Sequence, residues 1–137
     1  MADPVSLTVL VVDDDPAPRG LAAAFLRDLG YSTIVAADGK SAIQAARAHK
    51  GPLHLLLTDV IMPGMNGPRL AETLKKSRPE LRVAYMSGYG DDLLAQEGVV
   101  LEGTILVSKP FTSAELHAWV RAALERPTRA RDSSKKS

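Results

Sequence analysis

The stretch Leu53-His54-Leu55-Leu56-Leu57-Thr58-Asp59-Val60-Ile61-Met62-Pro63-Gly64-Met65-Asn66-Gly67 decides the fold of this chain. Its first six residues form a mainly apolar run that is typical of a buried strand, and a proline–glycine turn follows. Asp59 lies between the run and the turn. A carboxylate at the carboxyl end of a buried strand is partly desolvated, so it needs a partner or a chemical role. Asp59 is therefore the first candidate functional residue.

Strand and helix patterns alternate on both sides of this stretch. The strands that we expect cover residues 7–12, 32–36, 53–59, 81–86 and 104–107. The first run is apolar and β-branched throughout, which is typical of a strand buried on both faces. Such βα units in series predict an α/β fold, with a parallel sheet that is covered by helices on both faces.

Helix signals follow the strands. Asp15 is a suitable N-cap with Pro16 at the first helical position, and Gly30 suits the end of that helix. A second helix is expected over residues 41–50, and Thr112 caps the last one. The apolar spacing in the first and last helices predicts the following buried faces: Leu21, Ala22, Ala24, Phe25 and Leu29; Leu116, Trp119, Val120 and Ala123. Between the fourth and fifth strands, only residues 91–97 have helical character, so we expect a short fourth helix.

The composition excludes several classes of function. The 137 residues include no cysteine, which excludes disulfides, thiolate catalysis and zinc–thiolate sites. Aromatic residues make up only 4% of the chain, so base stacking on an aromatic platform is not expected. No apolar run approaches the length of a membrane span, and the chain does not begin like a signal peptide. We therefore expect a cytoplasmic protein.

The charge is unevenly distributed. Residues 126–137 contain five basic residues and one acid, so they carry +4, and the preceding residues carry −3 because the total is +1. We expect one domain over residues 1–126 and a disordered basic tail over residues 127–137. A solubilising end or linker stub is favoured over contact of this tail with nucleic acid or a membrane. No direct binding of nucleic acid is expected.

Polar residues follow four of the predicted strands. Asp13 and Asp14 follow the first strand, Asp59 closes the third, Ser87 follows the fourth and Lys109 follows the fifth. The carboxyl ends of parallel strands lie at one edge of the sheet, where α/β proteins bind their ligands. Each residue alone has an ordinary interpretation, such as an N-cap or a solvated charge. Their joint placement favours a functional site.

The residue types at this edge point to phosphoryl chemistry. Three carboxylates brought close together repel one another, so either one is protonated or a divalent cation neutralises them, and oxygen ligands suit Mg²⁺ better than zinc. Lys109 and the hydroxyl of Ser87 could bind phosphoryl oxygens. An aspartate in such a pocket can attack phosphorus and form an aspartyl phosphate. Asp59 is therefore predicted to be the nucleophile.

Five stretches of the chain together resemble the receiver domains of two-component response regulators. The matching stretches are Val11-Val12-Asp13-Asp14-Asp15, Ala37-Asp38-Gly39, Leu57 through Gly67, Met86-Ser87-Gly88-Tyr89 and Ser108-Lys109-Pro110-Phe111. The resemblance covers residues 7–124. It implies a doubly wound, flavodoxin-like fold of five strands and five helices with strand order 2-1-3-4-5.

The resemblance also implies a phospho-acceptor and a metal site. By position, Asp59 resembles the phospho-acceptor of the family. Mg²⁺ would be bound by Asp14, Asp59 and the backbone carbonyl of Ile61, with Asp13 acting through water.

Further roles are implied for Ser87 and Lys109. Ser87 resembles the switch hydroxyl that turns toward the phosphoryl group, Lys109 resembles the lysine that pairs with that group, and the Lys109–Pro110 bond is a candidate cis peptide. The implied partners are a histidine kinase or histidine phosphotransfer domain as donor and a downstream protein target. Phosphorylation would shift the surface around the fourth helix, fifth strand and fifth helix.

Two features depart from the family pattern. Leu106 stands where family members usually place an aromatic residue, three positions before the lysine, so the coupled aromatic rotation cannot occur as usual. Ile61 and Tyr89, which would flank the phosphoryl group, offer no acid or amide to orient a water molecule. We therefore predict slow self-dephosphorylation.

Alternative functions remain open at this point. The chain could be a stand-alone receiver, part of a hybrid histidine kinase, or part of a regulator that binds DNA. The first two are favoured because the irregular fourth helix and the stretches 86–89 and 109–112 resemble receivers of hybrid kinases or stand-alone phosphorelay members, and no helix-turn-helix pattern follows Leu124. A Mg²⁺-dependent phosphohydrolase with an aspartyl-phosphate intermediate would want an acid at the position of Ile61. A pseudo-receiver that only binds protein would not need all of the polar residues. We expect a signalling domain and not an enzyme.

Overall fold

The computed structural model describes residues 7–88 and 105–125, and the structural statements below concern these ranges. The elements follow in this order: β1 (Thr8–Val12), α1 (Pro16–Asp28), β2 (Ser32–Ala36), α2 (Gly39–Ala48), β3 (Leu55–Asp59), α3 (Gly67–Ser77), β4 (Arg82–Ser87), β5 (Ile105–Ser108) and α5 (Ser113–Glu125). The predicted fourth helix over residues 91–97 and the tail over residues 127–137 lie outside the described residues.

The five strands form one parallel sheet in the order β2-β1-β3-β4-β5. In its register, Val12 is level with Ala36 on one side and with Thr58 on the other, and Asp59 is level with Met86. The strands therefore end together at one edge. The predicted doubly wound α/β fold and its strand order are confirmed.

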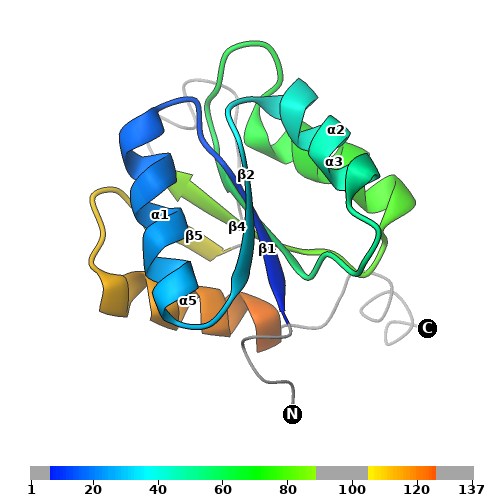
Figure 1. The fold of residues 1–137 in the computed structure, drawn as a ribbon. Helices are drawn as coiled ribbons and strands as arrows, with labels where there is room; N and C mark the ends of the chain where they lie inside the picture. The colour runs from blue at the N-terminus through cyan, green and yellow to red at the C-terminus, as the bar shows by residue number, and fades with distance from the viewer. Residues whose placement is uncertain (1–6, 89–104, 126–137) are drawn as a thin grey trace, which may run out of the picture.

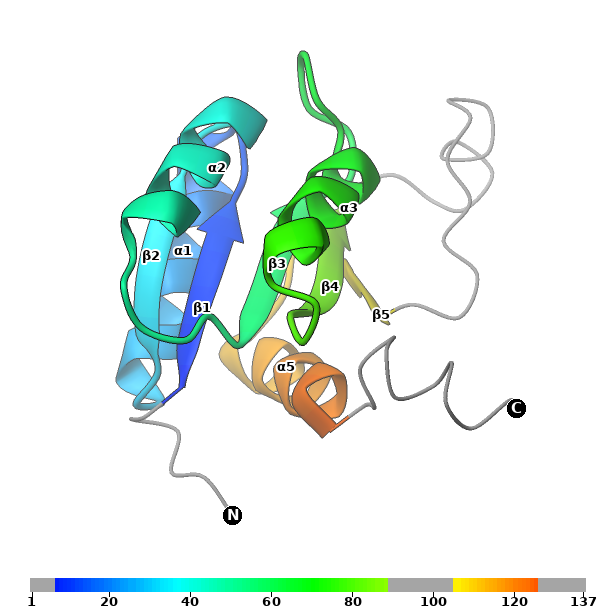
Figure 2. The same cartoon turned by 90° about the vertical axis from the view of Figure 1, so that its right-hand side faces the viewer.

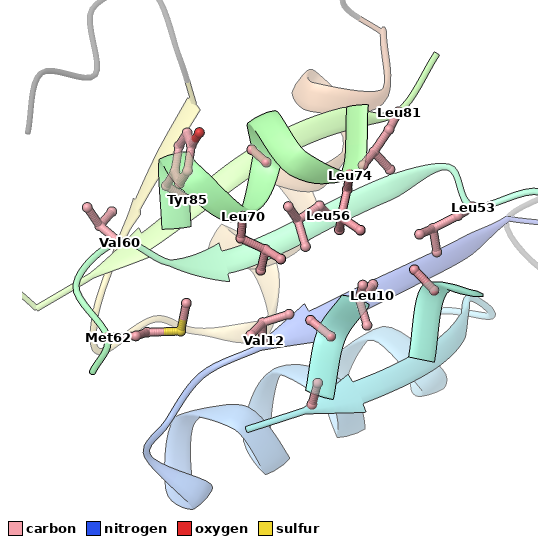
Figure 3. Packing of buried hydrophobic residues seen from close by; sticks show 14 residues of the cluster. Leu10, Val12, Leu53, Leu56, Val60, Met62, Leu70, Leu74, Leu81 and Tyr85 are labelled. Carbon is pink, nitrogen blue, oxygen red and sulfur yellow. The ribbon is translucent and has the colours of Figure 1, made fainter. Parts of the chain in front are cut away.

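Within the described residues, two helices cover each face of the sheet. Figures 1 and 2 show α1 and α5 on one face and α2 and α3 on the other. The apolar residues form two mainly aliphatic clusters: one lies between the sheet and α2 and α3, and the other lies between the sheet and α1 and α5. Figure 3 shows the first cluster, in which Leu10, Val12 and Leu56 of the strands face Leu70 and Leu74 of α3. Burial of both sheet faces explains why the sequences of the central strands β1 and β3 are almost continuously apolar.

The helix starts that we predicted from capping residues are confirmed. The Asp15 side chain accepts a hydrogen bond from the amide of Ala17 at 3.1 Å, and a proline occupies the first turn of α1. At α5, the Thr112 hydroxyl oxygen accepts from the amide of Glu115 at 3.1 Å, and the Glu115 carboxylate accepts from the amide of Thr112 at 2.9 Å. This reciprocal pair satisfies two amides that the first helical turn leaves without partners.

Some details of the prediction were wrong. Trp119 is 41% exposed and Leu21 is 42% exposed, although both were placed on buried helix faces. The buried face of α1 is made by Ala22, Ala23 and Leu26, and that of α5 by Leu116, Val120 and Ala123. The part of each helix that contacts the sheet is narrower than the apolar face predicted from the sequence. Apolar residues at the edge of that face therefore stay exposed to solvent. The second helix begins two residues earlier than expected, at Gly39, because Asp38 caps it.

Candidate functional site

The carboxyl ends of four strands bring the predicted site residues to one edge of the sheet. Asp13 directly follows β1, Asp59 is the last residue of β3, Ser87 is the last residue of β4, and Lys109 directly follows β5. Backbone hydrogen bonds join these ends, from the amide of Lys109 to the carbonyl of Ser87 at 2.9 Å among others. The parallel sheet therefore positions the polar residues next to one another, as the sequence predicted.

Asp59 lies at the centre of this edge and is only 7% exposed. Its Oδ1 accepts a hydrogen bond from the amide of Val60 at 3.1 Å and lies 3.3 Å from Nζ of Lys109. Burial raises the pKa of Asp59 from its ordinary value of 3.8 to about 6; the charge of Asp13 adds to this rise and that of Lys109 opposes it. Asp59 is thus an anion at neutral pH, but a more basic one than a solvated aspartate.

Asp13 and Lys109 form an ion pair beside Asp59. Asp13 is fully buried, and its Oδ2 accepts a hydrogen bond from Nζ of Lys109 at 2.9 Å. Burial lowers the pKa of Lys109, but the hydrogen bond and charge of Asp13 and the charge of Asp59 outweigh this effect, so the pKa is raised overall. The lysine therefore stays charged. Its peptide bond to Pro110 is cis, as predicted.

Three carboxylates could together bind a cation. One oxygen each from Asp13, Asp14 and Asp59 lies within 4.8 Å of the others, and Asp14 is exposed to solvent while the other two are buried. Three hard oxygen donors with one open side fit Mg²⁺, which keeps several water ligands. Ile61 lies two residues beyond β3, with a half-buried side chain that packs against the apolar cluster under α2 and α3.

Ser87 and Leu106 lie on the adjacent strands β4 and β5. Ser87 is 2% exposed and is level with Ser108, one position beyond the pair of Asp59 and Met86. Leu106 is half-buried and level with Tyr85 on β4. The strand position that would usually carry an aromatic residue thus holds an aliphatic one, and its neighbour across the strands is aromatic. Tyr89 lies outside the described residues.

Two residues of the site were not predicted from the sequence. Nη1 of Arg19 donates a hydrogen bond to the backbone carbonyl of Asp13 at 2.9 Å. Gly67 lies so close to β3 that a Cβ at this position would be 2.3 Å from the carbonyl oxygen of Asp59. A glycine in the first turn of a helix, where better helix formers are available, could have drawn attention to Gly67. Arg19 has no comparable signal, since arginine is ordinary in a helix.

Comparison with known proteins agrees with this geometry. The family model described as "Response regulator receiver domain" matches residues 9–121. The chain belongs to this family. This receiver domain is 32% identical over 121 residues to the sensor kinase CckA of Brucella abortus, and that alignment covers 88% of the chain and 13% of the kinase. A receiver domain is a signalling module, as we expected of this chain.

Solved structures resemble this receiver domain over nearly their whole length. The crystal structure of the receiver domain from the hybrid histidine kinase CckA is 33% identical, with a TM-score of 0.71, covering 86% of this chain and 99% of that one. The chemotaxis protein CheY4 of Vibrio cholerae is 25% identical, with a TM-score of 0.73, covering 85% and 98% of the two chains. The receiver domain spans about half the length, or less, of the first curated relatives that it matches.

None of the helices within residues 7–88 and 105–125 has the length and apolar character that crossing a membrane requires.

Proposed function

We propose that this receiver domain accepts a phosphoryl group on Asp59 from the phosphohistidine of a histidine kinase or histidine phosphotransfer domain. The observation that carries the proposal is the position of Lys109, whose Nζ lies 3.3 Å from Oδ1 of Asp59 and 2.9 Å from Oδ2 of Asp13. A nucleophilic carboxylate, a fixed positive charge and further acids at one sheet edge are the groups that phosphoryl transfer requires.

The reaction exchanges one bond to phosphorus for another. A carboxylate oxygen of Asp59 attacks the phosphorus atom, and the bond from phosphorus to the histidine nitrogen breaks. The nitrogen keeps the electron pair of that bond and takes up a proton. Because burial raises the pKa of Asp59 to about 6, its carboxylate is ionised at neutral pH and still more basic than a solvated one, which favours attack.

The neighbouring residues would stabilise the transferred group. Lys109 and the hydroxyl of Ser87 would bind phosphoryl oxygens, and Ser87 would turn toward them. Mg²⁺ would be bound by Asp14, Asp59 and the backbone carbonyl of Ile61, with Asp13 acting through water, and when bound it neutralises negative charge on the carboxylates and the phosphoryl oxygens. The cluster of three carboxylates supports this part of the proposal.

The phosphoryl group would act as a signal for a downstream protein. Its negative charge and acceptor oxygens would draw Ser87 inward and shift the neighbouring surface that contacts the target. Leu106 gives this switch an aliphatic side chain at the position of the usual aromatic residue. Similarity to the CckA receiver supports a phosphorelay context, as part of a hybrid kinase or as a stand-alone receiver.

The alternative functions are less well supported. A phosphohydrolase would need an acid or base near the position of Ile61, but this side chain is apolar and packs against the core. A receiver that only binds protein would have no use for a buried Asp13 and Asp59 paired with Lys109, because burying unneeded charges costs stability.

Phosphorylation by a small donor tests the proposal. The protein is incubated with Mg²⁺ and acetyl phosphate, and intact mass is measured. We expect one added phosphoryl group in the wild type and in Asp28→Asn, an exposed aspartate at the end of α1, and none in Asp59→Asn. The absence of an adduct in the wild type, or an undiminished adduct in Asp59→Asn, would rule the proposal out.

A further inference from the structure

All four backbone and carboxylate polar atoms of Asp13 have hydrogen-bond partners, and these come from different parts of the chain. Its amide donates to the carbonyl of Ala36 at 3.3 Å, and its carboxylate accepts from the amide of Asp15 at 3.0 Å and from Nζ of Lys109 at 2.9 Å. Its backbone carbonyl accepts from Nη1 of Arg19 at 2.9 Å. The hydrogen bond from Arg19 differs from the other three because its donor is a side chain of helix α1.

The carbonyl of Asp13 needs a partner from outside the sheet. The pairing of β1 with β3 ends at Val12 and Thr58, so the Asp13 carbonyl lies beyond the last pair. Asp13 itself is fully buried, and a buried backbone carbonyl is normally hydrogen-bonded. Arg19 supplies that hydrogen bond from the first turns of α1, where its own amide donates to the carbonyl of Asp15 at 3.2 Å.

Arg19 could influence the acid cluster in two opposite ways. Its positive charge lies beside three consecutive aspartates, residues 13–15, and by itself would repel a divalent cation. Its hydrogen bond fixes the backbone of Asp13 and thereby the direction of the carboxylate, which would favour cation binding. Replacement of Arg19 therefore changes Mg²⁺ affinity in opposite directions under the two roles.

We propose that Arg19 is a positioning residue of the phosphorylation site. Its guanidinium group fixes the backbone of Asp13, so that the buried carboxylate points at Lys109 and at the carboxylates of Asp14 and Asp59. A residue behind a metal ligand commonly determines how well that ligand is oriented, and its loss weakens metal affinity by about 10–100-fold. This inference rests on the proposed function, because the orientation of Asp13 matters for Mg²⁺ and for phosphoryl transfer.

Titration of the protein with Mg²⁺ alone, by calorimetry, tests the direction of the effect. We expect Arg19→Met to weaken Mg²⁺ affinity about tenfold and Arg19→Lys to recover part of the loss, because lysine restores a charged donor. Arg27→Met is the matched control, since Arg27 lies on the same helix and its Nε donates to the hydroxyl of the half-buried Thr33 on β2 at 2.6 Å. We expect this control to bind Mg²⁺ like the wild type.

Hydrogen exchange without metal gives a second readout. The amide of Asp15 donates to Oδ1 of Asp13, so it should exchange faster in Arg19→Met than in the wild type if the carboxylate loses its direction. If the Met variant does not fold, Arg19→Gln replaces it in both measurements. The same changes are expected, because glutamine is polar but lacks the charged guanidinium group.

The outcomes separate this inference from the proposed function. Unchanged or tighter Mg²⁺ binding in Arg19→Met, or no recovery in Arg19→Lys, would overturn the positioning role. A wild type that binds no Mg²⁺ and takes no phosphoryl group would instead overturn the proposed function. In that case the exchange of the Asp15 amide still decides whether Arg19 fixes Asp13.

Discussion

Nζ of Lys109 lies 2.9 Å from Oδ2 of Asp13, although 96 positions separate the two residues in the chain. The Asp13 side chain is fully buried and that of Lys109 is 18% exposed. A buried carboxylate needs a counter-charge, and the same ammonium group also lies 3.3 Å from Asp59. Lys109 therefore links the ends of β1, β3 and β5 through charge.

Replacement of Lys109 by methionine should destabilise the protein in the absence of metal. Asp13 and Asp59 would lose their shared counter-charge, and we expect a loss of about 2 kcal/mol in the free energy of unfolding at neutral pH. Urea unfolding in EDTA measures it. Arg121→Met is the control: Arg121 pairs with Glu125 at 3.5 Å on the surface, and its loss should cost less than about 0.5 kcal/mol. Equal losses in the two variants would contradict the prediction.

Asp59→Asn should make the protein more stable at neutral pH when no metal is bound. Burial, reinforced by Asp13, raises the pKa of Asp59 from 3.8 to about 6, so the folded state binds a proton more tightly than the unfolded state does. Protonation of Asp59 therefore stabilises the folded state fully below pH 3.8, and this contribution is lost as the pH rises through about 6. We expect Asn to add about 1–2 kcal/mol at neutral pH.

Urea unfolding in EDTA at several pH values tests this prediction. The difference in unfolding free energy between Asp59→Asn and the wild type should grow as the pH rises from acid to neutral, while Asp28→Asn, an exposed control, should not show that trend. An Asp59→Asn variant that is less stable than the wild type at neutral pH would refute the argument.

Protonation of His54 should lower the free energy of unfolding at acid pH. Its Nδ1 accepts a hydrogen bond from the amide of Thr8 at 3.0 Å, which requires that nitrogen to be unprotonated. Burial lowers the pKa of His54, and the charges of Arg82 and His49 lower it further. The stability from this contact is therefore present above the ordinary value of 6.5 and is lost as the pH falls through the lowered pKa.

His54→Asn is the control for that prediction, because the amide oxygen of asparagine can accept the same hydrogen bond without titrating. Thermal unfolding at neutral pH and near pH 5 gives the measurement. We expect the wild type to lose about 1 kcal/mol more than the variant on acidification. Because protonation of Asp59 also changes stability, with the opposite dependence on pH, the test is the difference between the two proteins. Parallel curves would count against the prediction.

Alanine substitutions at two glycines should have opposite effects. At Gly67 a Cβ would come 2.3 Å from the Asp59 carbonyl oxygen, so Gly67→Ala must displace the end of β3. We expect a loss of about 3 kcal/mol or more in stability, together with slower phosphorylation. Gly20 lies exposed in α1 with nothing near the added carbon, so Gly20→Ala should gain about 0.5–1 kcal/mol. Chemical denaturation of both variants measures the contrast, and a neutral Gly67→Ala would disprove the close contact.

A phosphoryl group on Asp59 should be lost slowly. Ile61 is apolar and packs against the core, so it cannot orient a water molecule toward the phosphorus. Decay of the phosphorylated protein in Mg²⁺, followed by intact mass, should extend over minutes or longer. Ile61→Asn, which introduces an amide, should shorten the lifetime several-fold. Loss from the wild type within seconds would contradict the prediction.

The sequence alone determined the order of the elements and the chemistry at their ends. Apolar runs of strand length, caps such as Asp15 and Thr112, and glycines at turns are local signals, because they depend on backbone preferences within a few residues. A parallel arrangement of these units places all carboxyl ends at one edge. The residue types of Asp13, Asp59, Ser87 and Lys109 then suffice to predict a phosphoryl-acceptor site.

Only the tertiary structure decided which contacts those residues make. It buries Asp13 and leaves Asp14 exposed, although the two are adjacent acids in the sequence. It leaves Trp119 in solvent, places Gly67 against the carbonyl of Asp59, and brings Arg19 to Asp13. The physical reason is that burial and desolvation depend on how elements pack across the sheet. The rise in the pKa of Asp59 to about 6 follows from that packing.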